Sequence, residues 1–504
     1  MRPFSLLFLF GILFSICSCR TDFSTVPNDG KLVFSKDTVF LDTVFSTISS
    51  STYLLKVYNH SKDDINIPTI KLGKGLNSKY RMTVDGMQGE NNRIFNNVTL
   101  LAKDSLYVFI ETIPNIADAN PNDFLYTDDI EFDSGTNLQK VALLTLVKDA
   151  VLLYPKLLSN GKTETVTFDN NELSGFYLDE NDAVNGNELH FTNQKAYVIY
   201  GYATVPEGKK VVFDAGARVY FHTNSGLIVP QSASLECNGT VSTTNKQENE
   251  IIFEGDRLEA DYANIPGQWS TIWLREGSTA HKINHLTIKN ATIGLRIDNQ
   301  DNTTVSIKNS QIYNSSNYGI LAQNAKIEGE NIAINTAGKA ALACTYGGNY
   351  LFAHCTFNNN WNSSQQFALS ISNYKTGANP ETSNLTRATF NNCIIYGAYS
   401  NELNLDKKDA ATFEYQFNNC LLKSDANNSN PLYNFNNNVR YNNIILNQNP
   451  RFLSIQNNKL NIDNTSAAFA KGNPAYSIPL DINGKTRTSP PDLGAYQSMA
   501  FPKN

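Results

Sequence analysis

The sequence predicts an all-β chain in which a β-sandwich is followed by a parallel β-helix, a solenoid built from short strands. Three observations indicate this: strand-length apolar runs between turn residues, a composition low in charge, and a short pattern that recurs in the second half. Charged residues make up 17% of the 504 residues and aromatic residues 11%. Aromatic and β-branched residues are those that strands prefer.

The recurring pattern is an apolar residue, two mostly polar or small residues, a small residue, and an apolar residue again within two positions. Its copies are Ile288–Ile293, Ile307–Ile312, Phe352–Phe357, Phe390–Ile395 and Phe417–Leu422. A short strand followed by a tight bend, repeated every ~20–40 residues, is typical of solenoids. We expect the asparagines of this pattern at the bends, because asparagine tolerates left-handed backbone.

Residues 1–18 are expected to be a lipoprotein signal peptide. Arg2 supplies a positive charge, and the apolar stretch of residues 4–16 is shorter than the ~20 residues that span a bilayer. The run Ile16-Cys17-Ser18-Cys19 resembles the bacterial lipobox, in which a signal peptidase cuts before a lipid-modified cysteine. The resemblance implies lipidation of Cys19, a tether over residues 19–30, and anchoring to the cell envelope at the outer membrane, on its periplasmic or outer side.

Residues 31–150 are predicted to form an antiparallel β-sandwich, because about seven strands within ~100 residues are typical of that fold. The runs are Leu32–Phe34, Val39–Leu41, Tyr53–Tyr58, Val98–Leu101, Leu106–Ile110, Ile130–Phe132 and Val141–Val147. The layout resembles the immunoglobulin-like domains of bacterial surface proteins, which implies a spacer or a binding module.

Residues 151–195 are expected to be a linker and the N-terminal cap of the solenoid. From residue 196 to residue 450 the strands are shorter and almost continuously apolar, as in Val211–Phe213 and Gly226–Val229. Such runs suit parallel strands that are stacked coil on coil. Cys355, Cys393 and Cys420 share one position of the repeat, and we expect them to fill the interior as small apolar residues.

Several segments of this region resemble a known fold. Tyr202–Gly208, Asp214–Phe221, Ile252–Arg257 and Pro266–Ile272 resemble the opening coils of right-handed parallel β-helix proteins, the pectate-lyase-like solenoids. Together with Phe40–Phe45 and Arg81–Gly86, they resemble an uncharacterised family of β-helix lipoproteins from Bacteroidota.

Residues 451–504 resemble the terminal segment that closes many bacterial surface β-helices. The matching residues are Asp481–Gly484, Arg487 and Asp492–Tyr496. Such a segment is expected to cover the open end of the solenoid, where unpaired strand edges would otherwise be exposed. Two alternatives stay open for Arg487, Asp481 and Asp492: they pair across this segment, or they are ordinary solvated charges.

Glycan chemistry has two sets of candidate residues. A polysaccharide lyase needs a basic residue beside carboxylates, often with calcium, and the catalytic candidates are Asp256, Arg257, Lys289, Arg296 and Asp298. The candidates for stacking against sugar rings are Trp269, Trp273, Tyr318, Tyr346 and Trp361. The charged candidates can equally be solvated surface groups, and some of the aromatic candidates can be buried.

Other functions find little support. A net charge of −6 offers no basic surface for nucleic acid. There is no CxxC pair, and His281 and His285 supply at most half of a zinc site, so no metal is expected. No cofactor is expected either, apart from calcium if the chain is a lyase.

The leading hypothesis is therefore a cell-envelope lipoprotein that binds glycans or has a structural role at the surface, without catalysis. The alternatives are a polysaccharide lyase that acts on uronate-containing glycans, and an adhesin or envelope assembly component with a protein partner. The loops that interrupt the repeat, at residues 254–268, 345–350, 358–388 and 400–415, are the expected places for function.

Overall fold

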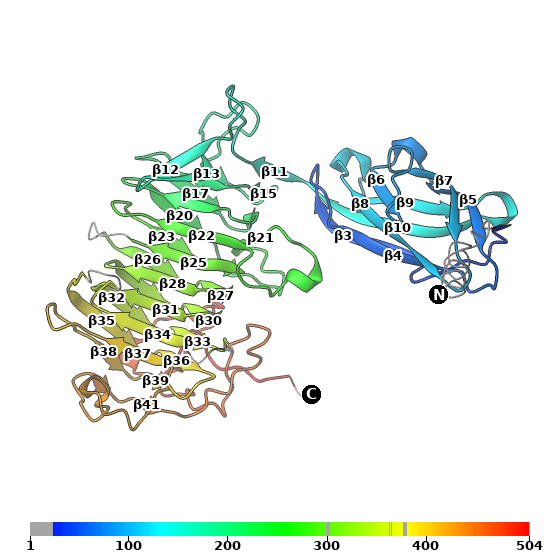
Figure 1. The fold of residues 1–504 in the computed structure, drawn as a ribbon. Coiled ribbons are helices and arrows are strands. Elements are labelled where there is room, and N and C mark those ends of the chain that lie inside the picture. Colours follow the sequence, from blue (N-terminus) through cyan, green and yellow to red (C-terminus); the bar gives the residue numbers. More distant parts are fainter. Residues whose placement is uncertain (1–23, 299–302, 362, 364, 376–380, 503–504) are drawn as a thin grey trace, which may run out of the picture. The chain divides into compact units, whose positions relative to one another are not determined.

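The computed structural model describes residues 24–298, 303–361, 363, 365–375 and 381–502. The signal peptide (residues 1–18), Cys19 and the first part of the tether lie outside the described residues. The chain divides into two compact units, Met1–Asp149 and Ala150–Asn504 (Figure 1). It is all-β, and the second unit contains three long parallel sheets, an arrangement compatible with the expected β-helix.

The first unit contains two sheets. The larger has the order β1-β5-β9-β10-β3 with β7 beside β5, and the smaller has the order β2-β4-β8-β6. The strands are β1 (Val26–Pro27), β2 (Val33–Phe34), β3 (Thr38–Phe45), β4 (Tyr53–Tyr58), β5 (Ile65–Leu72), β6 (Tyr80–Val84), β7 (Ile94–Leu100), β8 (Ser105–Thr112), β9 (Leu125–Phe132) and β10 (Gln139–Lys148). The 3-10 helices of this unit are η1 (Gly75–Asn77), η2 (Ile116–Asp118) and η3 (Gly135–Asn137).

The two sheets pack face to face. Side chains alternate between the buried and the exposed face, so that Val39 and Ile130 of the larger sheet share one core with Val57 and Val108 of the smaller. The expected antiparallel pairing is wrong for two pairs, because β1 pairs with β5 and β3 pairs with β10 in parallel. The sequence runs also missed β5 and β6.

The second unit contains three sheets, here called sheets I, II and III. Sheet I consists of β11 (Ala150–Leu153), β15 (Ala196–Ile199), β18 (Arg218–Phe221), β21 (Ile251–Gly255), β24 (Leu286–Lys289), β27 (Gln311–Ser315), β30 (Ala333–Ala337), β33 (Thr356–Asn359), β36 (Ile394–Gly397), β39 (Leu421–Leu422) and β41 (Ile445–Leu446). Sheet II consists of β12 (Thr165–Phe168), β13 (Asn171–Tyr177), β16 (Tyr202–Thr204), β19 (Gly226–Val229), β22 (Trp269–Leu274), β25 (Ala291–Ile297), β28 (Tyr318–Gln323), β31 (Ala340–Thr345), β34 (Phe367–Ser372) and β37 (Leu403–Asp406). Sheet III consists of β14 (His190–Phe191), β17 (Lys210–Asp214), β20 (Ser234–Asn238), β23 (Lys282–Asn284), β26 (Val305–Lys308), β29 (Lys326–Glu330), β32 (Gly348–Ala353), β35 (Leu385–Asn391), β38 (Gln416–Asn418) and β40 (Tyr441–Asn442).

Consecutive strands pass from sheet I to sheet II to sheet III, so that from β15 to β36 each strand pairs in parallel with the strand three places later. The expected linker, residues 151–195, already contributes β12, β13 and β14 and most of β11 to these sheets.

The 3-10 helices of this unit are η4 (Ala260–Tyr262), η5 (Pro431–Tyr433) and η6 (Pro474–Tyr476). None of the helices among the described residues could cross a membrane.

The recurring sequence pattern forms the corner between sheets III and I. In four of its five copies, an apolar residue of sheet III precedes the bend and an apolar residue of sheet I follows it, as at Ile307 and Ile312. The first residue of the bend has positive φ, for example 49° at Asn309 and 53° at Asn392. The copy at Ile288–Ile293 instead forms a corner between sheets I and II, with Asn290 at φ 62°.

The interior is built from aligned columns of side chains. Phe352, Phe390, Phe417 and Tyr441 of sheet III are paired in register, with neighbouring ring centroids 5.1–5.5 Å apart. The prediction for the cysteines is confirmed, because Cys355, Cys393 and Cys420 are free and fully buried in the same core.

Residues 423–440 lie against β37, the last strand of sheet II. The hydroxyl of Tyr433 accepts a hydrogen bond from the backbone N–H of Leu405 (2.8 Å) and donates to the carbonyl of Leu403 (3.2 Å). Tyr433 thereby provides partners for the backbone of β37, the last strand of sheet II. Its ring belongs to the interior core together with Tyr441.

The C-terminal segment packs along the outer face of sheet I, and its expected role in closing the end of the solenoid stays a prediction. Leu460, Ile482 and Tyr496 share a cluster with Ala333 of β30, and Leu493 shares one with residues of β36 and β39. These strands run from β30 to β39, and Ile445 of the last strand, β41, also packs against the second cluster.

Arg487 does not pair with Asp481 and Asp492. Its Nη2 donates to Asn331 Oδ1 (2.7 Å) and to the carbonyls of Gly494 and Ala495 (3.0 and 3.2 Å). The two aspartates accept hydrogen bonds from backbone N–H groups of the segment instead. Arg487 thus joins the C-terminal segment to the corner asparagines.

His354 occupies a corner position where other coils have asparagine, and it is fully buried. Its Nε2 accepts a hydrogen bond from Asn392 Nδ2 (3.0 Å), so the ring is neutral. Burial, and after it the charge of Arg487, lowers the pKa of His354 to about 3. Below pH ~6.5 the unfolded chain binds a proton at this histidine that the folded chain does not bind.

We therefore predict that acid destabilises the second unit through His354. The free energy of unfolding of the wild type, relative to that of a His354→Asn variant, falls by about 3 kcal/mol between pH 7.5 and pH 4. Asparagine can adopt the same positive φ and does not titrate. Urea unfolding of both proteins over this pH range measures the difference. Parallel stability curves would contradict the prediction.

Candidate functional site

The charged residues expected to form a catalytic site lie on two sheets and are engaged in ion pairs. On sheet I, Lys289 Nζ lies 3.3 Å from Glu254 Oε2. On sheet II, Arg296 Nη2 lies 2.8 Å from Asp298 Oδ2. Neighbouring coils place Glu254 beside Lys289, whereas Arg296 and Asp298 lie two residues apart in one coil. Each cation is thus paired within the chain, although Arg296 Nε and Asp298 Oδ1 are buried without a hydrogen-bond partner.

The two candidates in the loop after β21 are engaged in the same way. Asp256 Oδ2 lies 2.7 Å from His222 Nδ1, and this hydrogen bond raises the pKa of His222. Arg257 pairs with Glu259 (3.0 Å), and its guanidinium carbon lies 3.8 Å from the ring centroid of Tyr262. These contacts order the loop, and they bring neither Asp256 nor Arg257 to the Lys289–Glu254 pair.

Trp269 is not a stacking surface for sugars, because it is buried in the core. Its ring stacks on Phe221 with centroids 4.3 Å apart, and its Nε1 donates to the carbonyl of Lys289 (2.8 Å). Trp273 is only partly exposed. The guanidinium groups of Arg296 and Arg275 lie 4.1 and 4.5 Å from its ring centroid.

The remaining aromatic candidates, Tyr318, Tyr346 and Trp361, are partly exposed. The ring centroid of Tyr318 lies 5.6 Å from Lys339 Nζ, and that of Tyr346 lies 4.3 Å from Lys375 Nζ.

The two histidines that could have shared a metal have different environments. His281 is buried and hydrogen-bonded to Ser278, while His285 is a corner residue with a φ of 48°. No cluster of three or more metal-binding side chains occurs among the described residues.

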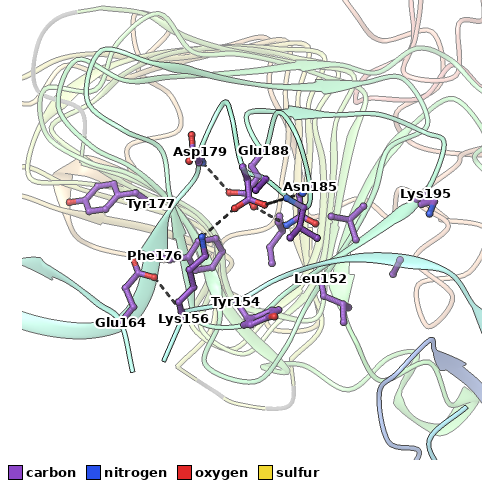
Figure 2. Close-up of a pocket in the computed structure, with 16 residues that line it drawn as sticks. Leu152, Tyr154, Lys156, Glu164, Phe176, Tyr177, Asp179, Asn185, Glu188 and Lys195 are labelled. Carbon is purple, nitrogen blue, oxygen red and sulfur yellow. Dashed lines mark hydrogen bonds and ion pairs between the residues drawn. The ribbon is translucent and has the colours of Figure 1, made fainter. Parts of the chain in front are cut away.

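A cavity of about 890 Å³ lies where the sheets of the second unit begin (Figure 2). It runs beside β11, the terminal strand of sheet I, and β13 of sheet II, and the loop of residues 178–189 encloses it. The polar, charged and tyrosine side chains that line the cavity are Tyr154, Lys156, Glu164, Tyr177, Asp179, Asp182, Asn185, Glu188 and Lys195.

Hydrogen bonds within the chain hold the acidic loop of the cavity in place. Asp182 Oδ1 accepts from the backbone N–H groups of Val184 and Asn185, each at 2.9 Å. Glu188 accepts from the side chain of Asn185 (2.9 Å) and from the backbone N–H of Asp179 (3.0 Å). The carboxylates are therefore positioned before any ligand arrives, and each keeps further capacity to accept hydrogen bonds.

Lys156 reaches across the cavity to this loop. Its Nζ lies 3.2 Å from Asp182 Oδ2, and its backbone N–H donates to Glu164 Oε2 (3.2 Å) (Figure 2). The hydrogen bond to Asp182 raises the pKa of Lys156. The backbone donors Asn185 and Val184, and after them Lys156, lower the pKa of Asp182. Both groups are charged at neutral pH, so Lys156 lacks the lone pair that a general base needs.

Two tyrosines give the cavity an apolar surface. Tyr154 is 56% exposed and Tyr177 is 50% exposed, and both line the cavity together with the carboxylates (Figure 2). A partly exposed ring beside fixed hydrogen-bond acceptors is a combination that can hold the apolar face and the hydroxyl groups of a sugar ring.

Sequence reasoning missed this cavity because its residues were assigned to the linker and cap. The signal that could have indicated it is the composition of residues 179–188, which contain Asp179, Glu180, Asp182 and Glu188 among turn-forming asparagines and a glycine. The acids themselves were visible, but only the fold brings Lys156 and Tyr177 to them.

Comparisons with known proteins do not assign the chain to a family. No family model and no curated protein matches it. A PapD-like domain of human CEP192 matches at 16% identity with a TM-score of 0.16, over 25% of this chain and 91% of that chain. A family 123 glycoside hydrolase from Clostridium perfringens matches at 10% identity with a TM-score of 0.17, over 24% of this chain and 30% of that chain. These TM-scores support no inference.

The contrasting positions of the aromatic residues make a testable prediction. Replacing Trp269 by alanine removes a buried ring and lowers the free energy of unfolding of the second unit by about 3–5 kcal/mol. Replacing the exposed Tyr177 by alanine changes it by no more than about 0.5 kcal/mol. Denaturant unfolding measures both changes, and a Trp269→Ala variant as stable as the Tyr177→Ala variant would contradict the buried position.

Proposed function

We propose that the chain is a membrane-anchored lipoprotein of the cell envelope that binds glycans without cleaving them. In this proposal Cys19 carries the lipid, the first unit is an immunoglobulin-like spacer, and the second unit is a right-handed parallel β-helix. The glycan occupies the cavity between β11, β13 and residues 178–189. The anchor and the finer fold assignments rest on the sequence resemblances.

One observation carries the glycan proposal: two half-exposed tyrosines line the same cavity as a set of fixed carboxylates. Tyr154 and Tyr177 offer ring faces, and Asp179 and Glu188 offer acceptors for hydroxyl groups. A volume of about 890 Å³ is within the range of small-molecule sites. Because the loop is already ordered, little conformational entropy is lost on binding.

Binding is favoured over a lyase reaction by the protonation states around the cavity. Lys156 has a raised pKa because it bonds to Asp182. A lyase base must accept the proton of the uronate, and a protonated lysine cannot. The catalytic candidates on sheets I and II also form ion pairs within the chain, Lys289 with Glu254 and Arg296 with Asp298.

A protein-binding role, as in an adhesin or an assembly component, finds support on the first unit. Leu54, Tyr107 and Phe109 are exposed on the outer face of the smaller sheet, where Leu54 pairs with Phe109 across strands. Apolar patches with polar surroundings often mark interaction surfaces.

Glycan binding is tested by screening the full chain against a panel of oligosaccharides and measuring affinities by calorimetry. A Tyr154→Ala/Tyr177→Ala double variant is expected to weaken binding tenfold or more, about 1.4 kcal/mol. A Tyr107→Ala variant, which removes an exposed tyrosine from the first unit, is the matched control and retains full affinity. Equal affinities for the wild type and the double variant would exclude the cavity as the site.

Incubation with uronate polymers in the presence of calcium is expected to give no ultraviolet-absorbing unsaturated products, because Lys156 remains protonated at neutral pH. Pectin, alginate and glycosaminoglycans are the polymers to assay, over several hours at pH 7. Unsaturated products that disappear in a Lys156→Met variant would establish the lyase in place of the binding protein.

A further inference from the structure

A buried glutamate and a buried glutamine meet at a corner between sheets I and II. Glu402 immediately precedes β37, and Gln366 immediately precedes the adjacent β34; the two are 0% and 1% exposed. A Cβ atom at Gly397 of β36 would lie 2.3 Å from the carboxyl carbon of Glu402. Glycine at this position therefore leaves the space that the carboxyl group occupies.

The hydrogen bonds of these two side chains can be counted completely. Gln366 Nε2 donates to Glu402 Oε1 (2.9 Å) and to the carbonyl of Asn359 (3.0 Å), which uses both of its hydrogens. Glu402 Oε1 also accepts from the backbone N–H of Tyr399 (2.8 Å). Two buried oxygens remain without a partner, Glu402 Oε2 and Gln366 Oε1.

Both of these oxygens are acceptors if Glu402 is ionised, so neither can satisfy the other. Rotating the amide of Gln366 does not help, because its oxygen would then face Glu402 Oε1 and the Asn359 carbonyl, which are also acceptors. A proton on Glu402 Oε2 supplies the missing donor. The acid and the amide would then be joined by two hydrogen bonds, and each side chain would be satisfied.

We propose that Glu402 is a neutral carboxylic acid in the folded protein, that it donates its proton to Gln366 Oε1, and that this acid–amide pair is a pH-sensitive latch. The latch closes the corner by joining the chain before β34 to the chain before β37. The backbone reinforces it, because the carbonyl of Glu402 accepts from the N–H groups of Ala368 (2.9 Å) and Leu369 (3.0 Å).

The surrounding charges do not offset the loss of this proton. The charge of Lys423 acts on Glu402, and Lys423 Nζ lies 5.0 Å from the ring centroid of Tyr396. Burial raises the pKa of Glu402 to about 7, and its hydrogen bonds and the charge of Lys423 lower it only in part. Between pH ~4.3, the pKa of an exposed glutamate, and about 7, closing the corner takes up a proton from solvent, and above about 7 it buries an anion.

Loss of the proton on opening therefore favours the open corner as the pH rises. Because an exposed glutamate has a pKa of ~4.3 and burial raises the pKa of Glu402 in the closed corner to about 7, the equilibrium shifts toward the open corner by about tenfold for each pH unit between ~4.5 and ~7 and levels off above ~7. Below this range the latch is most stable, and the core of the coil remains packed around it. Strands of distant coils share no hydrogen bond with the pair and are not affected.

Hydrogen exchange of the full chain between pH 4 and pH 9, corrected for intrinsic exchange rates, tests the latch. Amides of β34 and β37 in the wild type are expected to lose protection about tenfold per pH unit between pH ~4.5 and pH ~7, and to keep constant protection above pH ~7. A Glu402→Gln variant, which retains an uncharged side chain of the same shape, is expected to show no such loss. Amides of β22 serve as the internal control, with unchanged protection in both proteins.

The same pH dependence in wild type and variant, or constant protection in the wild type between pH ~4.5 and pH ~7, would overturn the proposal. A measurement on the wild type alone covers the case in which Glu402→Gln does not fold. Infrared spectra of protein labelled with ¹³C at the glutamate carboxyl groups are expected to show a carboxylic-acid carbonyl band at pH 6 that disappears by pH 9. Only carboxylate bands at pH 6 would equally overturn the latch.

Discussion

The structure of the second unit depends on the bend between sheets III and I. One residue with positive φ, usually asparagine, turns the chain, and the next residue, such as Cys393 or Cys420, points into the core. The bend is too short to allow slippage, so every coil places its apolar residues above those of the coil before. Parallel sheets with continuous interior columns follow from this one constraint.

The same bends also fix what lies outside the coil. Asn309 donates to Asn284 and Asn331 donates to Asn309, which links successive corners by side-chain hydrogen bonds. Further along, the corner residues bind the C-terminal segment: Asn392 makes two hydrogen bonds to the backbone of Asn473, and Asn331 accepts from Arg487. The C-terminal segment therefore follows the side of the solenoid, where bonding groups recur at each coil.

Regular stacking has a consequence for chemistry, because it places side chains of neighbouring coils in contact. Opposite charges such as Glu254 and Lys289 then neutralise each other, and a regular face offers few groups that a ligand could use. The stacking ends at β11, where the loop of residues 178–189 covers the first coil and leaves a cavity. The most favourable place for binding is thus the point at which the repeat stops.

The sequence by itself determined the all-β class, the interior position of the cysteines and the bends at asparagine, because these depend on local periodicity and backbone preference. It did not separate the buried Trp269 from the partly exposed Trp273, since alternation in a short strand leaves both faces possible until the register is fixed. Only the tertiary structure decided the course of the C-terminal segment. It also decided two side-chain contacts, that of Lys156 with Asp182 and that of Glu402 with Gln366. Those contacts join residues 26 and 36 positions apart, and coil stacking rather than sequence spacing sets such distances.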